Sequence, residues 1–369
     1  MADGTDAQYL KATPGNIPND GIIFVDHSKN HRGGHLGHAL VQCANGDVLA
    51  FYPNCGAEFM GHSGNGWMEY KRSADGGETW QEAKKLDYSY NLYSSGCGRT
   101  AMAEKAVCCD DGTVLLFLLI CDMTSKPLKS GDIKCWEPYF TPVVLKSTDN
   151  GETFSEAGKL TDKRGRVYDA LYRDGKVFVM FFANDAVIHY TGNLPEHEYE
   201  LYVSENSGKD FHLESVLSID PTGRCYGTME FLKDGRLMAV AYNSEDEYHP
   251  DYCVSEDMGK TWNEPGKLFM AKRLRNPQLV RFGNGYYIHG RSGNFGDKTL
   301  MGHFVIYYSE DAIHWDEGHY MQMRGTGAGA YSNNIVIKMP GTDKERLYIH
   351  SSHAYEQYLT NIVSFWIDK

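Results

Sequence analysis

The sequence predicts an all-β fold, a six-bladed β-propeller, and a repeated turn pattern is the first reason. A serine, an acidic or amide residue two positions later, a glycine and an aromatic residue recur in four full copies and one shortened copy: Ser73–Trp80, Ser147–Phe154, Ser204–Phe211, Ser255–Trp262 and Ser309–Trp315. The Asp or Asn side chain can accept hydrogen bonds from nearby backbone N–H groups, and the glycine supplies a positive φ. Copies about 50 to 75 residues apart are typical of a repeat architecture.

Paired apolar runs joined by tight turns are the second reason. The turns are strong hairpin signals: Asn45-Gly46, Asp111-Gly112, Asp174-Gly175, Asp234-Gly235 and Asn284-Gly285. A sixth unit begins at Gly325, with strands expected at 334–338, 346–350 and 362–367 but no copy of the turn pattern. Six units imply six blades. We expect residues 21–25 to supply the missing strand of the last blade, so that residues 1–369 form a single domain.

Charge and composition exclude several partners. The chain has 36 basic and 49 acidic side chains, for a net charge of −13, which argues against nucleic acid or an anionic membrane as the main partner. No stretch is long and apolar enough to span a bilayer. Residues 1–11 lack the basic and apolar regions of a signal peptide, so we expect a cytoplasmic protein. The nine cysteines show no Cys-x-x-Cys spacing and are expected to be reduced thiols.

The turn pattern resembles the Asp-box, or BNR, repeat of the sialidase-like β-propellers. Its copies extend from residue 73 to residue 315, so the resemblance covers most of the chain. The resemblance implies inner strands that line a central channel, with ligands at the channel mouth where those strands begin. Here the beginnings of the inner strands fall about ten residues before each hairpin glycine, at residues 34–38, 98–104, 165–169, 223–226, 274–276 and 329–333.

Four of these six strand beginnings carry an arginine: Arg99, Arg166, Arg224 and Arg275. Arginine binds carboxylates in a bidentate manner, and sulfate or phosphate would fit equally well. The sequence therefore predicts an anionic ligand, which we take to be an acidic oligosaccharide. Three polar residues at the same ends are further substrate-binding candidates: Asn276, Glu104 and Asp169.

The catalytic residues of sialidases are only partly matched. Tyr331 stands where the resemblance places a nucleophilic tyrosine. The Arg-Ile-Pro motif of the first blade is replaced by residues 35–38, which contain His35 and His38, and Tyr226 stands in the region of the catalytic glutamate. Histidine and tyrosine at these places are loosely similar to the propeller-type ulvan lyases and to a related group that cleaves rhamnose–glucuronate linkages.

These residue types suit β-elimination beside a uronate. The reaction needs a cation to neutralise the carboxylate, a base for the C5 proton and an acid for the leaving oxygen. We expect His35 or His38 to be the base, because histidine titrates near neutral pH, and Tyr226, Tyr168 or Tyr331 to be the acid.

Two alternatives stay open. One is an exo-glycoside hydrolase that uses Tyr331 and a carboxylate from Glu104, Asp169 or Glu230. The other is a glycan-binding propeller without catalysis. Histidines 31, 35, 38, 350 and 353 could in principle bind a metal. We expect them to be hydrogen-bonded residues instead, with no metal or other cofactor.

Overall fold

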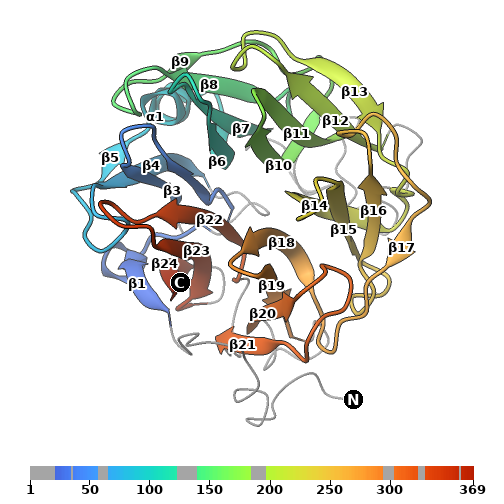
Figure 1. The fold of residues 1–369 in the computed structure, drawn as a ribbon. Helices are drawn as coiled ribbons and strands as arrows, with labels where there is room; N and C mark the ends of the chain where they lie inside the picture. The colour runs from blue at the N-terminus through green and yellow to red at the C-terminus, as the bar shows by residue number, and fades with distance from the viewer. Residues whose placement is uncertain are drawn as a thin grey trace, which may run out of the picture.

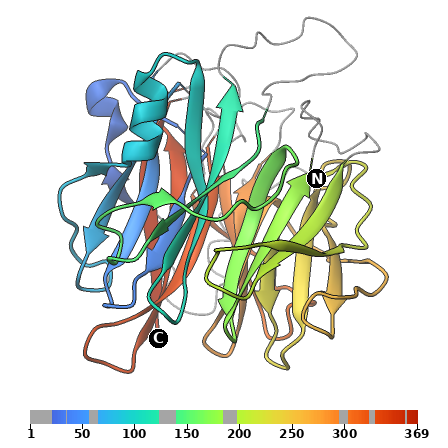
Figure 2. The ribbon, with the colours of Figure 1, turned by 90° about the horizontal axis from the view of Figure 1, so that it is seen from above.

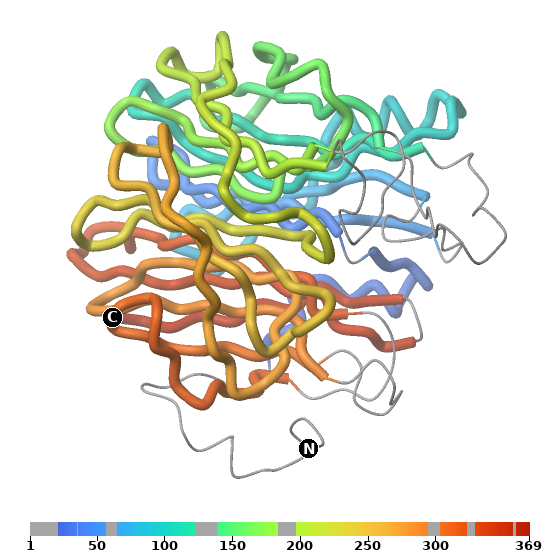
Figure 3. The backbone as a smooth tube through the Cα atoms, turned by 90° about the vertical axis from the view of Figure 1, so that its right-hand side faces the viewer, coloured from blue at the N-terminus to red at the C-terminus, as the bar shows by residue number. Residues whose placement is uncertain are grey.

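Six four-stranded antiparallel sheets surround a central axis in the computed structural model, so the prediction of an all-β six-bladed propeller is confirmed (Figure 1). The structure describes residues 21–34, 36–56, 65–122, 139–183, 197–293, 303–322, 329–356 and 359–369. The blades follow one another around the ring in chain order (Figure 1), and Figure 3 shows the ring from the side.

The first three blades are formed by consecutive strands. Blade 1 contains β2 (Ala39–Gln42), β3 (Val48–Cys55), β4 (Gly66–Ser73) and β5 (Lys84–Lys85). Blade 2 contains β6 (Arg99–Cys108), β7 (Val114–Asp122), β8 (Val143–Ser147) and β9 (Ser155–Glu156). Blade 3 contains β10 (Gly165–Arg173), β11 (Lys176–Ala183), β12 (Glu198–Ser204) and β13 (His212–Val216).

The last three blades include the sheet that joins the two ends of the described chain. Blade 4 contains β14 (Arg224–Phe231), β15 (Leu237–Asn243), β16 (Asp251–Ser255) and β17 (Gly266–Lys267). Blade 5 contains β18 (Arg275–Phe282), β19 (Gly285–Ser292), β20 (His303–Ser309) and β21 (His319–Gln322). Blade 6 contains β22 (Ser332–Lys338), β23 (Glu345–Ala354), β24 (Thr360–Asp368) and β1 (Ile22–Val25).

Strand β1 is the outer strand of blade 6. It pairs antiparallel with β24, with Ile22 opposite Ser364 and Ile23 opposite Val363. In Figure 1 the blue β1 lies beside the red β24. The first described strand therefore completes a sheet whose other three strands come from the end of the chain.

Helices are few among the described residues. A 3-10 turn covers His27–Asn30, and the α-helix α1 covers Asp87–Ser94. Helix α1 packs on β4 and β6 and lies at one end of the strands (Figure 2). Within the described ranges, no helix has the length and apolar character needed to cross a membrane.

The repeated turns join the third and fourth strands of blades 1 to 5. In the first, the Ser73 hydroxyl donates to the Asp75 carboxylate over 2.7 Å and accepts from the Gly77 N–H over 2.8 Å. Gly77 has a φ of 89°, and in the shortened fifth copy Ala312 takes its place with a φ of 66°. The predicted turn chemistry therefore holds in the structure, and it fixes how the outer strand of each blade leaves its neighbour.

Bulges in four inner strands determine which side chains reach the mouth of the channel. The pairing register shifts once in each of these strands. The shift lies between Ala103 and Lys105 in β6 and between Val167 and Asp169 in β10. It lies between Cys225 and Gly227 in β14 and between Arg275 and Gln278 in β18. A bulge bends the strand and changes the direction of a side chain, and bulges are over-represented beside functional sites. The residues left outside the ladders are Glu104, Tyr168, Tyr226 and Asn276 with Pro277.

Candidate functional site

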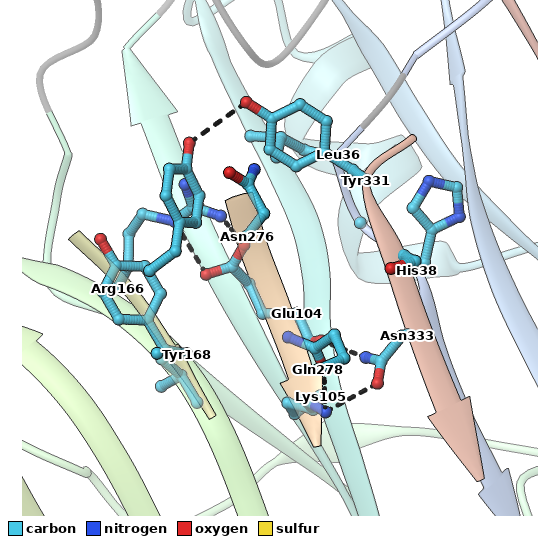
Figure 4. A pocket seen from close by; sticks show the side chains of 15 residues that line it. Leu36, His38, Glu104, Lys105, Arg166, Tyr168, Asn276, Gln278, Tyr331 and Asn333 are labelled. Atoms are coloured by element: carbon cyan, nitrogen blue, oxygen red, sulfur yellow. Dashed lines mark hydrogen bonds and ion pairs between the residues drawn. The ribbon is translucent and has the colours of Figure 1, made fainter. Parts of the chain in front are cut away.

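A pocket lies on the central axis at the end where the inner strands begin. We call it the central pocket. Every blade contributes to it, and its lining includes Leu36, Gly37, His38, Glu104, Lys105, Arg166, Val167, Tyr168, Tyr226, Gly227, Asn276, Gln278, Tyr331, Ser332 and Asn333. Its cavity measures about 50 Å³, which is room for a few water molecules or one carboxylate-sized group. Figure 4 shows its side chains converging from different strands.

The bulges supply much of the pocket's chemistry. Glu104, Tyr168, Tyr226 and Asn276, each extruded from a different inner strand, all line the pocket. Tyr226 and Asn276 have positive φ values of 41° and 52°, a conformation that non-glycine residues rarely adopt. Local backbone strain of this kind clusters at functional sites. The sequence predicted these four residues as site candidates, and the structure brings them together.

Arg166 is held in a buried ion pair with Glu104. Its Nε donates to Glu104 Oε2 over 3.0 Å, and its Nη2 donates to the other carboxylate oxygen. Only 4% of Arg166 is exposed. The guanidinium lies 4.9 Å from the ring centre of Tyr226 and 5.4 Å from that of Tyr168. The charge of Arg166 is therefore balanced within the protein, and its main effect is to fix two tyrosine rings.

Two tyrosine hydroxyls meet at the mouth of the pocket. The oxygens of Tyr226 and Tyr331 lie 3.4 Å apart, and their rings pack edge to face with centroids 5.8 Å apart. Burial raises the pKa of Tyr226 well above the ordinary value of 10, and the neighbouring Tyr331 raises it further. Tyr226 therefore carries its proton at neutral pH and can donate it.

Lys105 forms the floor of the central pocket. Its ammonium lies 3.0 Å from Asp169 Oδ1 and donates to Gln278 and Asn333 over 2.7 Å each. These contacts use all three donors of an ammonium group. Asp169 also accepts hydrogen bonds from the Thr228 hydroxyl and the Met229 N–H, both over 2.7 Å. Asp169, predicted as a substrate-binding residue, therefore belongs to this buried network that links blades 2 to 6.

A second cavity of about 500 Å³ continues along the channel on the other side of Lys105 and contains Glu230. The Glu230 carboxylate accepts the N–H groups of Phe231 over 2.7 Å and Arg281 over 2.8 Å. Burial, with a smaller contribution from the charge of Asp169, raises its pKa from 4.5 to about 7. Glu230 therefore lies on the far side of the floor from the tyrosines.

The raised pKa of Glu230 gives a prediction for stability. The folded protein binds this proton more tightly than the unfolded chain does, so the contribution of Glu230 is greatest below pH 4.5 and declines as the pH rises through about 7. Glu230→Gln is expected to remove this decline. Denaturant midpoints at pH 5, 6 and 7 measure it, with the exposed Glu310→Gln as control. Parallel curves for Glu230→Gln and wild type would contradict the assignment.

The four arginines predicted as a group do not come together. Of these four, only Arg166 is among the described residues that line the central pocket. Arg224 is ion-paired with Asp251 and donates to the Thr222 carbonyl over 2.9 Å. Arg99 is exposed. Their equivalent places in the repeat put them at the same end of the ring, but their side chains point in different directions.

Arg275 contacts a tyrosine. Its neighbour Arg291 was assigned no role in the sequence analysis. Arg275 donates to the Tyr242 hydroxyl over 3.0 Å and lies 3.3 Å from a Glu247 carboxylate oxygen. Arg291 is its partner in the β18–β19 ladder and is 4% exposed. Burial and the charge of Arg275 lower the pKa of Arg291 to about 10, while Tyr331 opposes that shift.

Arg291 could have been found from the hairpin. If the two strands are paired residue by residue outward from the turn at Asn284 and Gly285, Arg291 falls opposite Asn276, one residue from Arg275. The bulge at residues 276–277 then makes Arg291 and Arg275 direct partners. A bulge cannot be read from the hydrophobic pattern, so that pattern offers no reason to prefer this arginine.

The histidines divide into three groups. His38 lines the central pocket and is buried. His350 is buried beside Phe24, with ring centres 4.3 Å apart, and burial lowers its pKa well below the ordinary value. His35 lies outside the described residues. Across the described ranges, no group of three or more His, Cys, Asp or Glu side chains could hold a metal ion.

Comparisons with known proteins agree with the fold. No protein-family model and none of the curated proteins matches this chain. In structure it is similar to a protein of unknown function from Dyadobacter fermentans, with a TM-score of 0.69, 16% identity and coverage of 97% of this chain and 100% of that one. It is also similar to a point mutant of the NanB sialidase from Streptococcus pneumoniae, with a TM-score of 0.65, 12% identity and coverage of 99% and 72%.

A third solved structure is named as a different enzyme and has the same fold. The α-L-arabinanase of Penicillium chrysogenum, solved with arabinobiose, matches with a TM-score of 0.57, 16% identity and coverage of 95% of each chain. Because all three identities are low, these likenesses establish the fold alone. The chain has the fold of the sialidase-like six-bladed propellers.

Proposed function

We propose that this sialidase-like propeller is a carbohydrate-active enzyme that cleaves a glycosidic bond at or next to an acidic sugar by elimination. The observation that carries the proposal is the contact between the hydroxyls of Tyr226 and Tyr331 in a pocket to which every blade contributes. Solved structures with this fold include proteins named as a sialidase and an arabinanase, which supports a carbohydrate substrate.

The tyrosines take the role of acid. Tyr226 is protonated at neutral pH because burial raises its pKa. Arg166 holds the ring of Tyr226, and Tyr331 lies within reach of the Tyr226 oxygen. A tyrosine proton would pass to the leaving glycosidic oxygen as the C4–O bond breaks.

His38 takes the role of base. It lines the same pocket from blade 1, whereas Tyr168 and Tyr226 line it from blades 3 and 4. It would remove the C5 proton, and the electron pair of that C–H bond would form the C4–C5 double bond. The atoms balance without water, since the tyrosine proton goes to the leaving oxygen and the C5 proton stays on the histidine.

A positive potential beside the tyrosines supports an acidic substrate. Arg273, Arg275 and Arg291 gather near the beginning of β18, and Arg273 and Arg275 share the single carboxylate of Glu247. A carboxylate on the sugar would be attracted to this end of the pocket. Neutralising that carboxylate makes the C5 proton more acidic.

Hydrolysis is the second candidate, and one observation favours it. Glu104 lines the pocket that contains Tyr331, whereas Asp169 and Glu230 lie at or beyond the Lys105 floor. A tyrosine and one carboxylate could then act together. Arg166 binds both oxygens of Glu104, so a sugar would have to compete with this buried ion pair for the carboxylate, and elimination ranks first.

A panel of oligosaccharides tests the proposal. The full chain is incubated separately with uronate-containing, sialylated and neutral oligosaccharides, and the masses of the products are measured by mass spectrometry. Elimination gives products whose masses sum to that of the substrate and an unsaturated uronate that absorbs in the ultraviolet. In hydrolysis the product masses sum to that of the substrate plus one water, and this result would favour the hydrolase over elimination. Binding without cleavage would leave a glycan-binding propeller, and no effect on any acidic sugar would overturn the proposal.

A further inference from the structure

A second pocket, the lateral pocket, opens at the same end of the propeller as the central pocket. It measures about 330 Å³ and is lined by Tyr88, Leu92, Arg99, Ile120, Phe140, Thr141, Val143 and Arg164. Arg99 begins β6 and Arg164 directly precedes β10, and these inner strands begin at the mouth of the channel. Tyr88 and Leu92 come from helix α1, one turn apart on the same face.

Two arginines flank one aromatic ring in the lateral pocket. The Arg99 guanidinium lies 4.1 Å from the ring centre of Phe140, and that of Arg164 lies 5.7 Å from it. An arginine stacked on an aromatic ring keeps the N–H groups at its edge available. The ring therefore orients the two guanidinium groups and leaves them able to bind an anion.

Neither arginine of this pair is held in an ion pair by a described carboxylate, although Asp122 lies opposite Arg99 in the β6–β7 ladder and Glu156 lies near Tyr88. Both side chains are exposed, no Asp or Glu is among the described residues that line the pocket, and neither arginine has an ion pair within the described chain. Most of the other described arginines are ion-paired with carboxylates: Arg72, Arg166, Arg173, Arg224, Arg236, Arg273, Arg275 and Arg346. In a chain with a net charge of −13, two exposed arginines over one aromatic ring, neither in an ion pair within the described chain, point to an anionic ligand.

Two adjacent residues join the lateral pocket to the central pocket. Tyr139 packs against Arg166, whose guanidinium lies 5.7 Å from the Tyr139 ring centre. Phe140, the next residue, lines the lateral pocket, and its N–H donates to the Ile120 carbonyl over 2.9 Å. Tyr139 also forms a bridge to Cys121 on β7. The two pockets are therefore neighbours, separated by the buried ring of Tyr139.

We propose that the lateral pocket is an accessory subsite for a second acidic sugar of the same oligosaccharide. The inference rests on the proposed function for the identity of the ligand, and it adds that the substrate carries at least two acidic residues. Phe140 and Tyr88 would offer an apolar surface to the sugar ring, and Arg99 and Arg164 would bind its carboxylate or sulfate group.

Oligogalacturonates of two, three and four residues are the probe, titrated into the full chain by calorimetry at low salt. If the probe is cleaved, the titration uses Tyr331→Phe. We expect the tetramer to bind more tightly than the dimer. The double variant Arg99→Gln/Arg164→Gln should weaken tetramer binding roughly 3- to 30-fold, which is the range for two exposed charge pairs. Dimer binding should not change, because the central pocket is intact.

The matched control removes the same charge elsewhere. Arg173→Gln/Arg236→Gln takes away two arginines at the hairpin end of the strands, one of which also stacks on an aromatic ring, with Arg173 4.5 Å from the Phe231 ring centre. This control should bind like wild type. Arg99→Lys/Arg164→Lys should restore part of the affinity, and added salt should weaken wild type more than Arg99→Gln/Arg164→Gln.

The outcomes separate this inference from the proposed function. Equal affinity for all lengths, equal loss in the control variant, or no binding of the probe would overturn the accessory subsite. Cleavage of acidic oligosaccharides with an unaffected Arg99→Gln/Arg164→Gln variant would leave the proposed function standing alone. Length-dependent binding that is lost in this variant, in a protein that cleaves nothing, would support the subsite and remove the enzymatic function.

Discussion

Tyr331→Phe is expected to lower kcat/KM on the cleaved acidic oligosaccharide by roughly 10²- to 10⁴-fold, the usual contribution of a general acid or base. The substitution removes one oxygen and keeps the ring, which packs edge to face on Tyr226. Tyr226→Phe should have an effect of the same order, because the two hydroxyls contact each other and neither is expected to act alone. Steady-state kinetics of the purified variants gives the measurement.

The control is a tyrosine of the same blade that lies away from the channel. Tyr348 is buried in β23 and packs on Trp80 and Trp366 rather than on the central pocket. Tyr348→Phe should keep normal turnover, and all three variants should melt near the wild-type temperature. Wild-type turnover in both Tyr331→Phe and Tyr226→Phe would rule out the tyrosine mechanism, and attention would move to Glu104.

Lys105→Met is expected to lower the free energy of unfolding by about 3–5 kcal/mol, the cost of leaving a buried charge without its partner. The ammonium balances Asp169, which is 2% exposed, and also bonds to Gln278 and Asn333. Methionine has a similar length but no charge, so the loss would report on electrostatics more than on packing. Chemical denaturation at neutral pH measures it.

A second variant separates the charge from the position. Lys105→Met/Asp169→Asn removes both charges and leaves an amide oxygen to accept from Thr228 and Met229, so it should recover part of the loss. The exposed Lys338→Met should change stability by less than about 0.5 kcal/mol. A Lys105→Met variant as stable as wild type would show that the network is not a structural support.

The blades were predictable because their signals are local. The Ser73–Asp75–Gly77 pattern contains every atom needed for its own turn, and the hairpin glycines fix strand pairing within a few residues. Repetition then made each weak signal strong. The beginnings of the inner strands could likewise be located by counting, and this brought Tyr168, Tyr226 and Tyr331 onto the list of site residues.

The partners of the charged residues were not predictable in the same way. Arg166 and Glu104 are 62 residues apart, and Lys105 and Asn333 are 228 apart. The sequence shows equivalent arginines, but whether each one faces the channel, a neighbouring blade or solvent depends on the bulges and on packing between blades. For that reason Arg166, expected to bind substrate, is engaged with Glu104, and Arg291 received no role.

The four bulges have a consequence for how such a protein could acquire a new substrate. Glu104, Tyr168 and Tyr226 stand outside the regular ladders, while the residues that follow them return to paired positions. Exchanging an extruded side chain therefore leaves the hydrogen bonds of its blade in place. Evolution could vary the chemistry at the mouth while each blade keeps its backbone pairing, with Glu104 and Arg166 changing together because each balances the other's buried charge. Relatives with different reactions could then share a backbone while few of their mouth residues coincide.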